Sequence, residues 1–148
     1  YTRAIGERTR DLHDELGGTP LTLIGWSLGG VIARETARLF EPYVREVITL
    51  GTPIIGGPKY TAAAERFAEA SNIDLDEFEI EVHERNSVGL KQPVTSIYSK
   101  LDGVVGWRAS IDVYNEQARN IEVYSSHFGI GANGRVWRLI ADILAGRH

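Results

Sequence analysis

The pentapeptide Gly25-Trp26-Ser27-Leu28-Gly29 comes directly after the short apolar run Leu21–Ile24 and directly before a helical pattern over Val31–Phe40. A strand that turns this sharply into a helix holds its middle residue at the tip of the turn, with the side chain exposed. Glycine is expected at positions 25 and 29 because a Cβ there would press on neighbouring backbone. The stretch therefore predicts a strand, a tight turn and a helix, with the Ser27 hydroxyl above the helix N-terminus.

A serine at this position is suited to be a nucleophile, although a glycine-rich turn that carries a solvated serine is the simpler alternative. A serine hydroxyl reacts poorly at neutral pH, so catalysis requires a histidine that takes its proton and a carboxylate that orients the histidine. The chain has four histidines, and only His127 follows a strand-like run, Ile121–Tyr124, after the serine. A loop histidine can also be ordinary surface, but its place after the last strand makes His127 the candidate base.

The candidate carboxylate is Asp102. It lies in the turn Lys100–Gly103, which ends the strand-like run Val94–Ser99, and catalytic groups collect at the carboxyl ends of parallel strands. Asp-Gly is also a common turn dipeptide, so shaping the loop is the alternative role for Asp102. Other aspartates stand in helical or acidic surface patterns with no strand immediately before them: Asp74, Asp76, Asp112 and Asp142.

With these residues in this order, the chain resembles the α/β-hydrolase superfamily, in particular its bacterial esterase- and lipase-like members. The resemblance runs from about Pro20 to Ala145 and rests on four stretches: Gly25–Gly30, Val47–Pro53, Ile97–Val105 and Ser126–Gly129. It implies a Ser27, Asp102 and His127 triad that forms and then hydrolyses an acyl-enzyme, with no metal and no cofactor. One departure is Ile54, because lipase-like relatives often carry a histidine after Gly-Thr-Pro.

The expected fold is a truncated α/β-hydrolase fold, with a mainly parallel sheet of about four strands flanked by helices. A single domain is expected over residues 1–148. The strand-like runs are Leu21–Gly25, Glu46–Leu50, Val94–Ser99 and Ile121–Tyr124. We expect only the second half of the family's usual sheet in this chain.

In that family the strand before the serine is central, so the truncation would leave its edge unpaired and prone to associate. We expect a second copy of the chain, a separate partner chain or the opening helix over Tyr1–Leu16 to cover this edge. The oxyanion hole would keep one backbone donor, the Leu28 N–H, unless a partner supplies the second.

Apolar side chains next to the three site residues indicate a hydrophobic acyl pocket, although each could equally be part of the core. They are Trp26, Ile54, Ile55, Val104, Val105, Trp107 and Phe128. The longest insertion between strands, about residues 57–92, is expected to be either a cap over the site, as in the family, or an ordinary crossover helix.

Composition limits the possible partners. The net charge of −4, the lack of lysine clusters and the lack of a glycine-rich phosphate loop argue against nucleic acid and nucleotides. No apolar run is long enough to span a membrane. The absence of cysteine excludes disulfides and a thiol nucleophile, and leaves both the cytoplasm, slightly favoured, and the cell exterior possible. Because the chain has no methionine, we expect that Tyr1 is not the translated start.

The expected function is hydrolysis of a small-molecule or lipid-like carboxylic ester. His127 would deprotonate Ser27, and Asp102 would stabilise the resulting imidazolium. Thioesterase, amidase and acyltransferase chemistry uses the same triad and stays open. The alternative from another class is a catalytically incomplete half-domain that keeps the triad residues but acts as a binding or assembly module.

Overall fold

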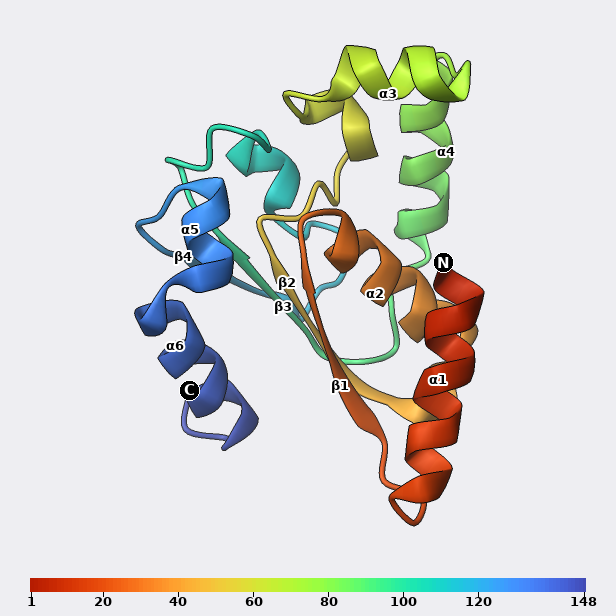
Figure 1. Ribbon diagram of the computed structural model, residues 1–148, viewed down its shortest axis with the longest axis vertical. Helices are drawn as coiled ribbons and strands as arrows, with labels where there is room; N and C mark the ends of the chain where they lie inside the picture. The colour runs from red at the N-terminus through yellow and green to blue at the C-terminus, as the bar shows by residue number, and fades with distance from the viewer.

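A computed structural model describes all 148 residues, and its centre is one parallel sheet (Figure 1). The strands lie in the order β1-β2-β3-β4: β1 (Leu21–Trp26), β2 (Val44–Leu50), β3 (Val94–Tyr98) and β4 (Arg119–Glu122). The helices are α1 (Thr2–Glu15), α2 (Leu28–Leu39), α3 (Ala64–Ser71), α4 (Leu75–Ser87), α5 (His127–Ala132) and α6 (Gly134–Leu144). Short 3₁₀ turns are η1 (Glu41–Tyr43), η2 (Gly57–Tyr60) and η3 (Trp107–Ser110). The predicted α/β architecture with four parallel strands is confirmed.

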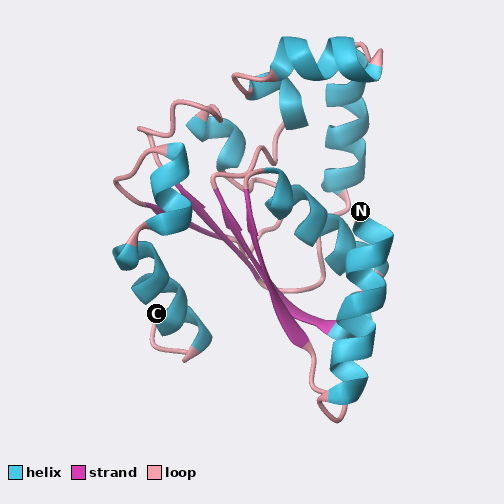
Figure 2. Cartoon of the chain, in the orientation of Figure 1, coloured by secondary structure: helices cyan, strands magenta, loops and turns pink.

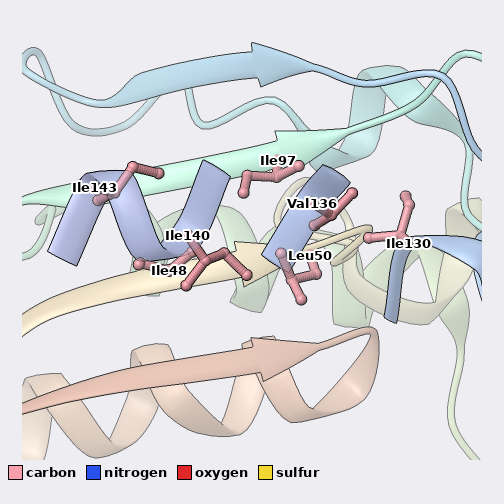
Figure 3. Close-up of a cluster of buried hydrophobic side chains, with 7 residues drawn as sticks. All are labelled: Ile48, Leu50, Ile97, Ile130, Val136, Ile140 and Ile143. Carbon is pink, nitrogen blue, oxygen red and sulfur yellow. The ribbon is translucent and has the colours of Figure 1, made fainter. Parts of the chain in front are cut away.

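Helices cover both faces of the sheet, with α1 and α2 on one side and α5 and α6 on the other (Figure 2). The strand residues alternate accordingly, because successive side chains of a strand point to opposite faces. Val47 packs against Ala33 and Ala37 of α2, whereas Ile48 and Leu50 pack beneath α6. Figure 3 shows this second cluster, in which the remaining members are Ile97, Ile130, Val136, Ile140 and Ile143.

Two local expectations were wrong. The last strand, β4, covers Arg119–Glu122 and not Ile121–Tyr124, because Arg119 and Asn120 pair with Thr95 and Ser96 of β3. The Asn120 side chain also accepts a hydrogen bond from the Asp112 N–H and donates one to the Asp112 carbonyl. His127 is not in a loop but is the first residue of α5, since the Ser126 side chain caps this helix by accepting from the Gly129 N–H.

The outer edge of β1 is unpaired within the chain, because β1 pairs only with β2. Helix α1 does not cover that edge: it packs against α2 and η1, with Gly6 directly beneath the Phe40 ring. The opening helix is therefore excluded as the cover for the β1 edge. No helix of the chain combines the length and the apolar character that crossing a membrane requires.

The insertion between β2 and β3 forms η2, α3 and α4, which stand beyond the carboxyl ends of the strands (Figure 1). Asp74 caps the N-terminus of α4, because its side chain accepts hydrogen bonds from the N–H groups of Asp76 and Glu77. Lys59 of η2 binds the side chains of Asp76 and Glu79, so η2 is tied to the first turns of α4. Helix α4 then leads back into β3. The segment η2–α3–α4 therefore both connects β2 to β3 and covers the carboxyl ends of the strands.

Candidate active site

Ser27 stands at the junction of β1 and α2 in a strained backbone conformation, with φ +53° and ψ −124°. Positive φ is unfavourable for a residue with a Cβ and persists only where the surroundings enforce it. Here the Ser27 N–H donates to the Leu50 carbonyl of β2 at 2.8 Å, and the Ser27 carbonyl accepts from the Gly30 N–H at 3.0 Å. The turn is therefore fixed on both sides of the serine.

Two glycines allow the turn to pack. A Cβ on Gly25 would lie 2.4 Å from the Gly29 carbonyl oxygen and 2.4 Å from the Gly30 Cα, so the expectation for position 25 is confirmed. The expectation for position 29 was wrong, because a Cβ there would meet nothing within 4 Å. The second restricted position is Gly30, where a Cβ would lie 1.9 Å from the Thr52 hydroxyl. Helix α2 is thus pressed against β1 through Gly25 and against the loop after β2 through Gly30.

Replacing Gly25 by alanine is expected to destabilise the chain by about 1–3 kcal/mol, because the new methyl group overlaps backbone atoms that cannot rotate away. Gly29→Ala is the matched control, since it adds the same methyl group to open space inside α2. It should stabilise the helix by roughly 0.5–1 kcal/mol. Urea unfolding of both variants measures the difference, and a Gly25→Ala variant as stable as the unmodified chain would contradict the packing described here.

Asp102 and His127 form a buried hydrogen-bonded pair. Asp102 Oδ2 lies 2.8 Å from His127 Nδ1, and the two residues are only 5% and 4% exposed. The other carboxylate oxygen, Oδ1, accepts from the N–H groups of Val104 and Val105, while the Asp102 carbonyl accepts from the His127 N–H. These bonds hold the carboxylate in one orientation, so the imidazole is oriented through its Nδ1 and its Nε2 is directed away from Asp102.

The surroundings of the pair link it to the turn that carries Ser27. Gly51, the residue after β2, has φ +52°, and a Cβ on it would lie 2.8 Å from Asp102 Oδ2 and 3.3 Å from His127 Nδ1. The preceding residue, Leu50, is the one that accepts from the Ser27 N–H. Trp26 donates from its indole N–H to the His127 carbonyl at 3.1 Å, with the ring centroids 5.4 Å apart. These residues thus lie together at the carboxyl ends of the four strands.

Ser27 opens into a pocket of about 260 Å³ under the helical insertion. Its apolar wall combines α2, the loop after β2, the insertion and the loop after β3: Leu28, Val31, Pro53, Ile54, Pro58, Phe67, Phe78, Val82, Val104 and Val105. A cap over the site was one of the two expectations for residues 57–92, but the individual contacts Phe67, Phe78 and Val82 were not predicted, because α3 and α4 reach the pocket only through the tertiary fold. No group of three or more histidine, aspartate or glutamate side chains lies close enough to hold a metal ion.

The residues predicted to bind substrate divide into two groups. Ile54, Val104 and Val105 belong to the pocket wall, and Leu28 lies beside them. The others lie outside that wall: Trp26 packs on His127, Phe128 is 71% exposed, and Ile55 and Trp107 border a separate hollow of about 350 Å³.

The sequence did not predict the buried ion pair between Arg34 and Asp112. Asp112, which the sequence pattern placed on the surface, is buried and accepts a 2.6 Å hydrogen bond from Arg34 Nη1. Burial alone would raise the pKa of Asp112, but the Arg34 charge and the hydrogen bonds from Arg34, Asn115 and Tyr114 outweigh it, so the pKa is lowered. The available signal was the position of Arg34, seven residues after Ser27 and so on the same face of α2.

Comparison with known proteins identifies the fold. The family model of the α/β hydrolase fold matches residues 1–89. The mature lipase BlEst2 of Bacillus licheniformis superimposes with a TM-score of 0.69 at 15% identity, covering 95% of this chain and 71% of the lipase. A monoacylglycerol lipase of Paleococcus ferrophilus gives a TM-score of 0.66 at 15% identity, covering 99% and 76% of the two chains. For a hydrolase of Pseudomonas aeruginosa PA01 the TM-score is 0.69 at 14% identity, with 98% and 72% covered.

No curated protein sequence matches the chain. At such low identities the solved structures are evidence of shared fold alone. The family model, in contrast, spans more than half of the residues and includes the turn at Ser27. The chain therefore belongs to the α/β-hydrolase fold family.

Proposed function

We propose that this chain hydrolyses carboxylic esters, with Ser27 as nucleophile, His127 as general base and Asp102 as the carboxylate that orients the histidine. The observation that carries the proposal is the buried 2.8 Å hydrogen bond between Asp102 and His127. This pair and Ser27 both lie at the carboxyl ends of the strands. Ser27 adds a strained backbone at the mouth of an apolar pocket. These features match the roles that a serine hydrolase requires of its three residues.

In the proposed reaction, His127 Nε2 takes the proton of the Ser27 hydroxyl while Oγ attacks the ester carbonyl carbon. The bond from that carbon to the alcohol oxygen breaks, and the imidazolium returns the proton to the leaving alcohol. Water then attacks the acyl-enzyme with His127 again as base, releasing the acid and restoring Ser27. Asp102 accepts the Nδ1–H throughout and stabilises the imidazolium.

Leu28 is proposed as the oxyanion donor. It is the first residue of α2, where backbone N–H groups have no acceptor within the helix. Such a donor, together with the positive end of the helix dipole, favours the negative charge that develops on the carbonyl oxygen. A second donor is worth about a hundred- to a thousand-fold in rate, and we propose that a second copy or a partner chain on the free β1 edge supplies it.

The pocket supports a hydrophobic acyl group, because almost all of its wall near Ser27 is aliphatic or aromatic. We propose Ile54, Val104 and Val105 as acyl contacts. Two of the similar solved structures are lipases, which favours ester substrates of this kind. Thioesters, amides and acyl transfer use the same three residues and are to be tested beside esters.

The free β1 edge favours a second candidate function. A strand edge with unpaired N–H and C=O groups is a template for association, so the chain could act as a binding or assembly module with an incomplete oxyanion hole. Oligomeric state separates the two candidates. An assembly that pairs the β1 edge can supply the second oxyanion donor and fits the enzyme, whereas a stable monomer leaves the oxyanion hole with one donor and fits the module.

Hydrolysis of p-nitrophenyl butyrate and p-nitrophenyl octanoate by the purified chain tests the first candidate. We expect saturable turnover of both esters, with a lower KM for octanoate because its longer chain buries more apolar surface in the pocket. Release of p-nitrophenol no faster than in buffer would reject hydrolysis by this chain and favour the binding module.

A further inference from the structure

The pocket has one charged end, which lies down the helix from Ser27. Ser27, Val31, Arg34 and Glu35 all belong to its wall, and their spacing places them on one face of α2. Seven residues at 1.5 Å each put Arg34 about 10 Å from Ser27 along the helix axis. The side chains of a helix lean toward its N-terminus, so the guanidinium reaches back toward the serine.

One edge of the Arg34 guanidinium has no partner in the protein. Nη1 donates to Asp112, but Nε and Nη2 are buried without any hydrogen-bond acceptor. Nε–H and the adjacent Nη2–H point in parallel from the same side of the planar group, which is the geometry that binds a carboxylate with two hydrogen bonds. Burying charged donors without acceptors is costly, so an acceptor that enters the pocket and reaches this edge is strongly favoured.

The charges around this edge favour an anion over a neutral acceptor. The Asp112 carboxylate also accepts from the Asn115 side chain and from the N–H groups of Tyr114 and Asn115, which disperses its charge. Glu35 lies between two further cations, 3.3 Å from Arg85 and 3.7 Å from Arg38. The wall at this end of the pocket therefore holds two arginines, Arg34 and Arg85, and one carboxylate, Glu35.

Val31 lies between Ser27 and Arg34 on this face of α2, and Phe67, Phe78 and Val82 add apolar surface to the wall of the same pocket. A substrate that uses both ends needs an ester carbonyl at Ser27, an aliphatic chain along this wall and an anionic group at the far end. We propose that Arg34 is a specificity-determining residue that selects acyl groups ending in a carboxylate, so that the preferred substrates are half-esters of aliphatic dicarboxylic acids. The choice of an ester as substrate rests on the proposed function, whereas the preference for binding a terminal carboxylate does not depend on it.

The preference can be measured by calorimetry in the Ser27→Ala background, which binds ester without turnover. The probes are monomethyl suberate and methyl octanoate, which share the ester and the chain length and differ by the terminal carboxylate. We expect the suberate half-ester to bind about tenfold more tightly, the effect of hydrogen bonds to a charged group. Arg34→Lys keeps the charge that balances Asp112 but removes the parallel N–H pair, and should reduce the preference to about threefold or less.

Two further variants complete the test. Arg85→Gln removes the same charge from the same pocket without altering the Arg34 edge, and should keep most of the preference. Arg34→Gln combined with Asp112→Asn removes both members of the ion pair and leaves no unpaired buried charge, so we expect this variant to fold and to lack the preference even if Arg34→Lys is unstable. Equal binding of the two probes in the Ser27→Ala chain, or a preference that survives both Arg34 changes, overturns the inference. A preference that depends on Arg34 in a chain that hydrolyses no ester would refute the proposed function alone.

Discussion

Replacing Ser27 by alanine is expected to lower kcat/KM for p-nitrophenyl octanoate by on the order of 10⁴- to 10⁶-fold. The substitution removes the atom that is proposed to form the acyl-enzyme, while the pocket wall and the buried pair of Asp102 and His127 stay in place. Alanine also tolerates the strained turn no worse than serine, since both carry a Cβ at φ +53°. The loss should therefore appear in kcat, with the thermal midpoint nearly unchanged.

Ser71→Ala is the matched control for this prediction. Ser71 is an exposed serine at the end of α3, remote in sequence from the turn, and its removal should leave both kcat and KM within about twofold, as is usual for surface changes. Residual activity of Ser27→Ala above about one-hundredth of the unmodified chain would mean that another group attacks the ester.

Replacing Asp102 by asparagine is expected to lower kcat by about 10⁴-fold. The amide can still accept the Val104 and Val105 N–H groups through Oδ1, so the loop after β3 keeps its shape. In place of Oδ2, however, it presents an NH₂ group to His127 Nδ1, which then must accept a hydrogen bond and not donate one. The proton moves to Nε2, the nitrogen that should take the Ser27 proton, and the histidine is no longer a base.

The nitrogen-15 spectrum of the imidazole checks this account. The spectrum should report a protonated Nδ1 in the unmodified chain and a protonated Nε2 in the Asp102→Asn variant. Asp142→Asn is the control, because Asp142 forms an exposed ion pair with Arg147 near the end of α6. An Asp102→Asn variant with more than a tenth of the normal kcat would show that the carboxylate is dispensable.

The parallel sheet and its four strands were predictable because local sequence and tertiary packing agree. The run Leu21–Ile24 is aliphatic or β-branched and leads into a helix, which parallel sheets require of their connections. The same local rules placed Asp102 in the loop that follows β3 and His127 after β4, as the structure has them. The boundaries of β4 were harder to predict, since they depend on which residues pair with Thr95 and Ser96 of β3, a strand far away in the chain.

The pocket was predictable only where its wall belongs to the loops that carry the site residues. Ile54 and Val105 could be predicted on that ground, but Phe67 and Phe78 reach the pocket because α3 and α4 fold back over the sheet. The need for glycine at position 30 could not be predicted either. A side chain there would overlap Thr52, which lies outside the turn. The buried state of Asp112 depends on Arg34, whose partner is 78 residues away in the chain.

The most direct test of the central claim is acid quenching of the chain during hydrolysis of p-nitrophenyl octanoate, followed by peptide mass spectrometry. The proposed mechanism predicts one octanoyl group on the peptide that contains Ser27 and none in the Ser27→Ala variant. The His127→Ala variant should show the adduct only after far longer incubation, because no base is left to take the hydroxyl proton. An octanoyl group on any other residue, or turnover without an acylated peptide, would contradict the assignment of Ser27 as the nucleophile.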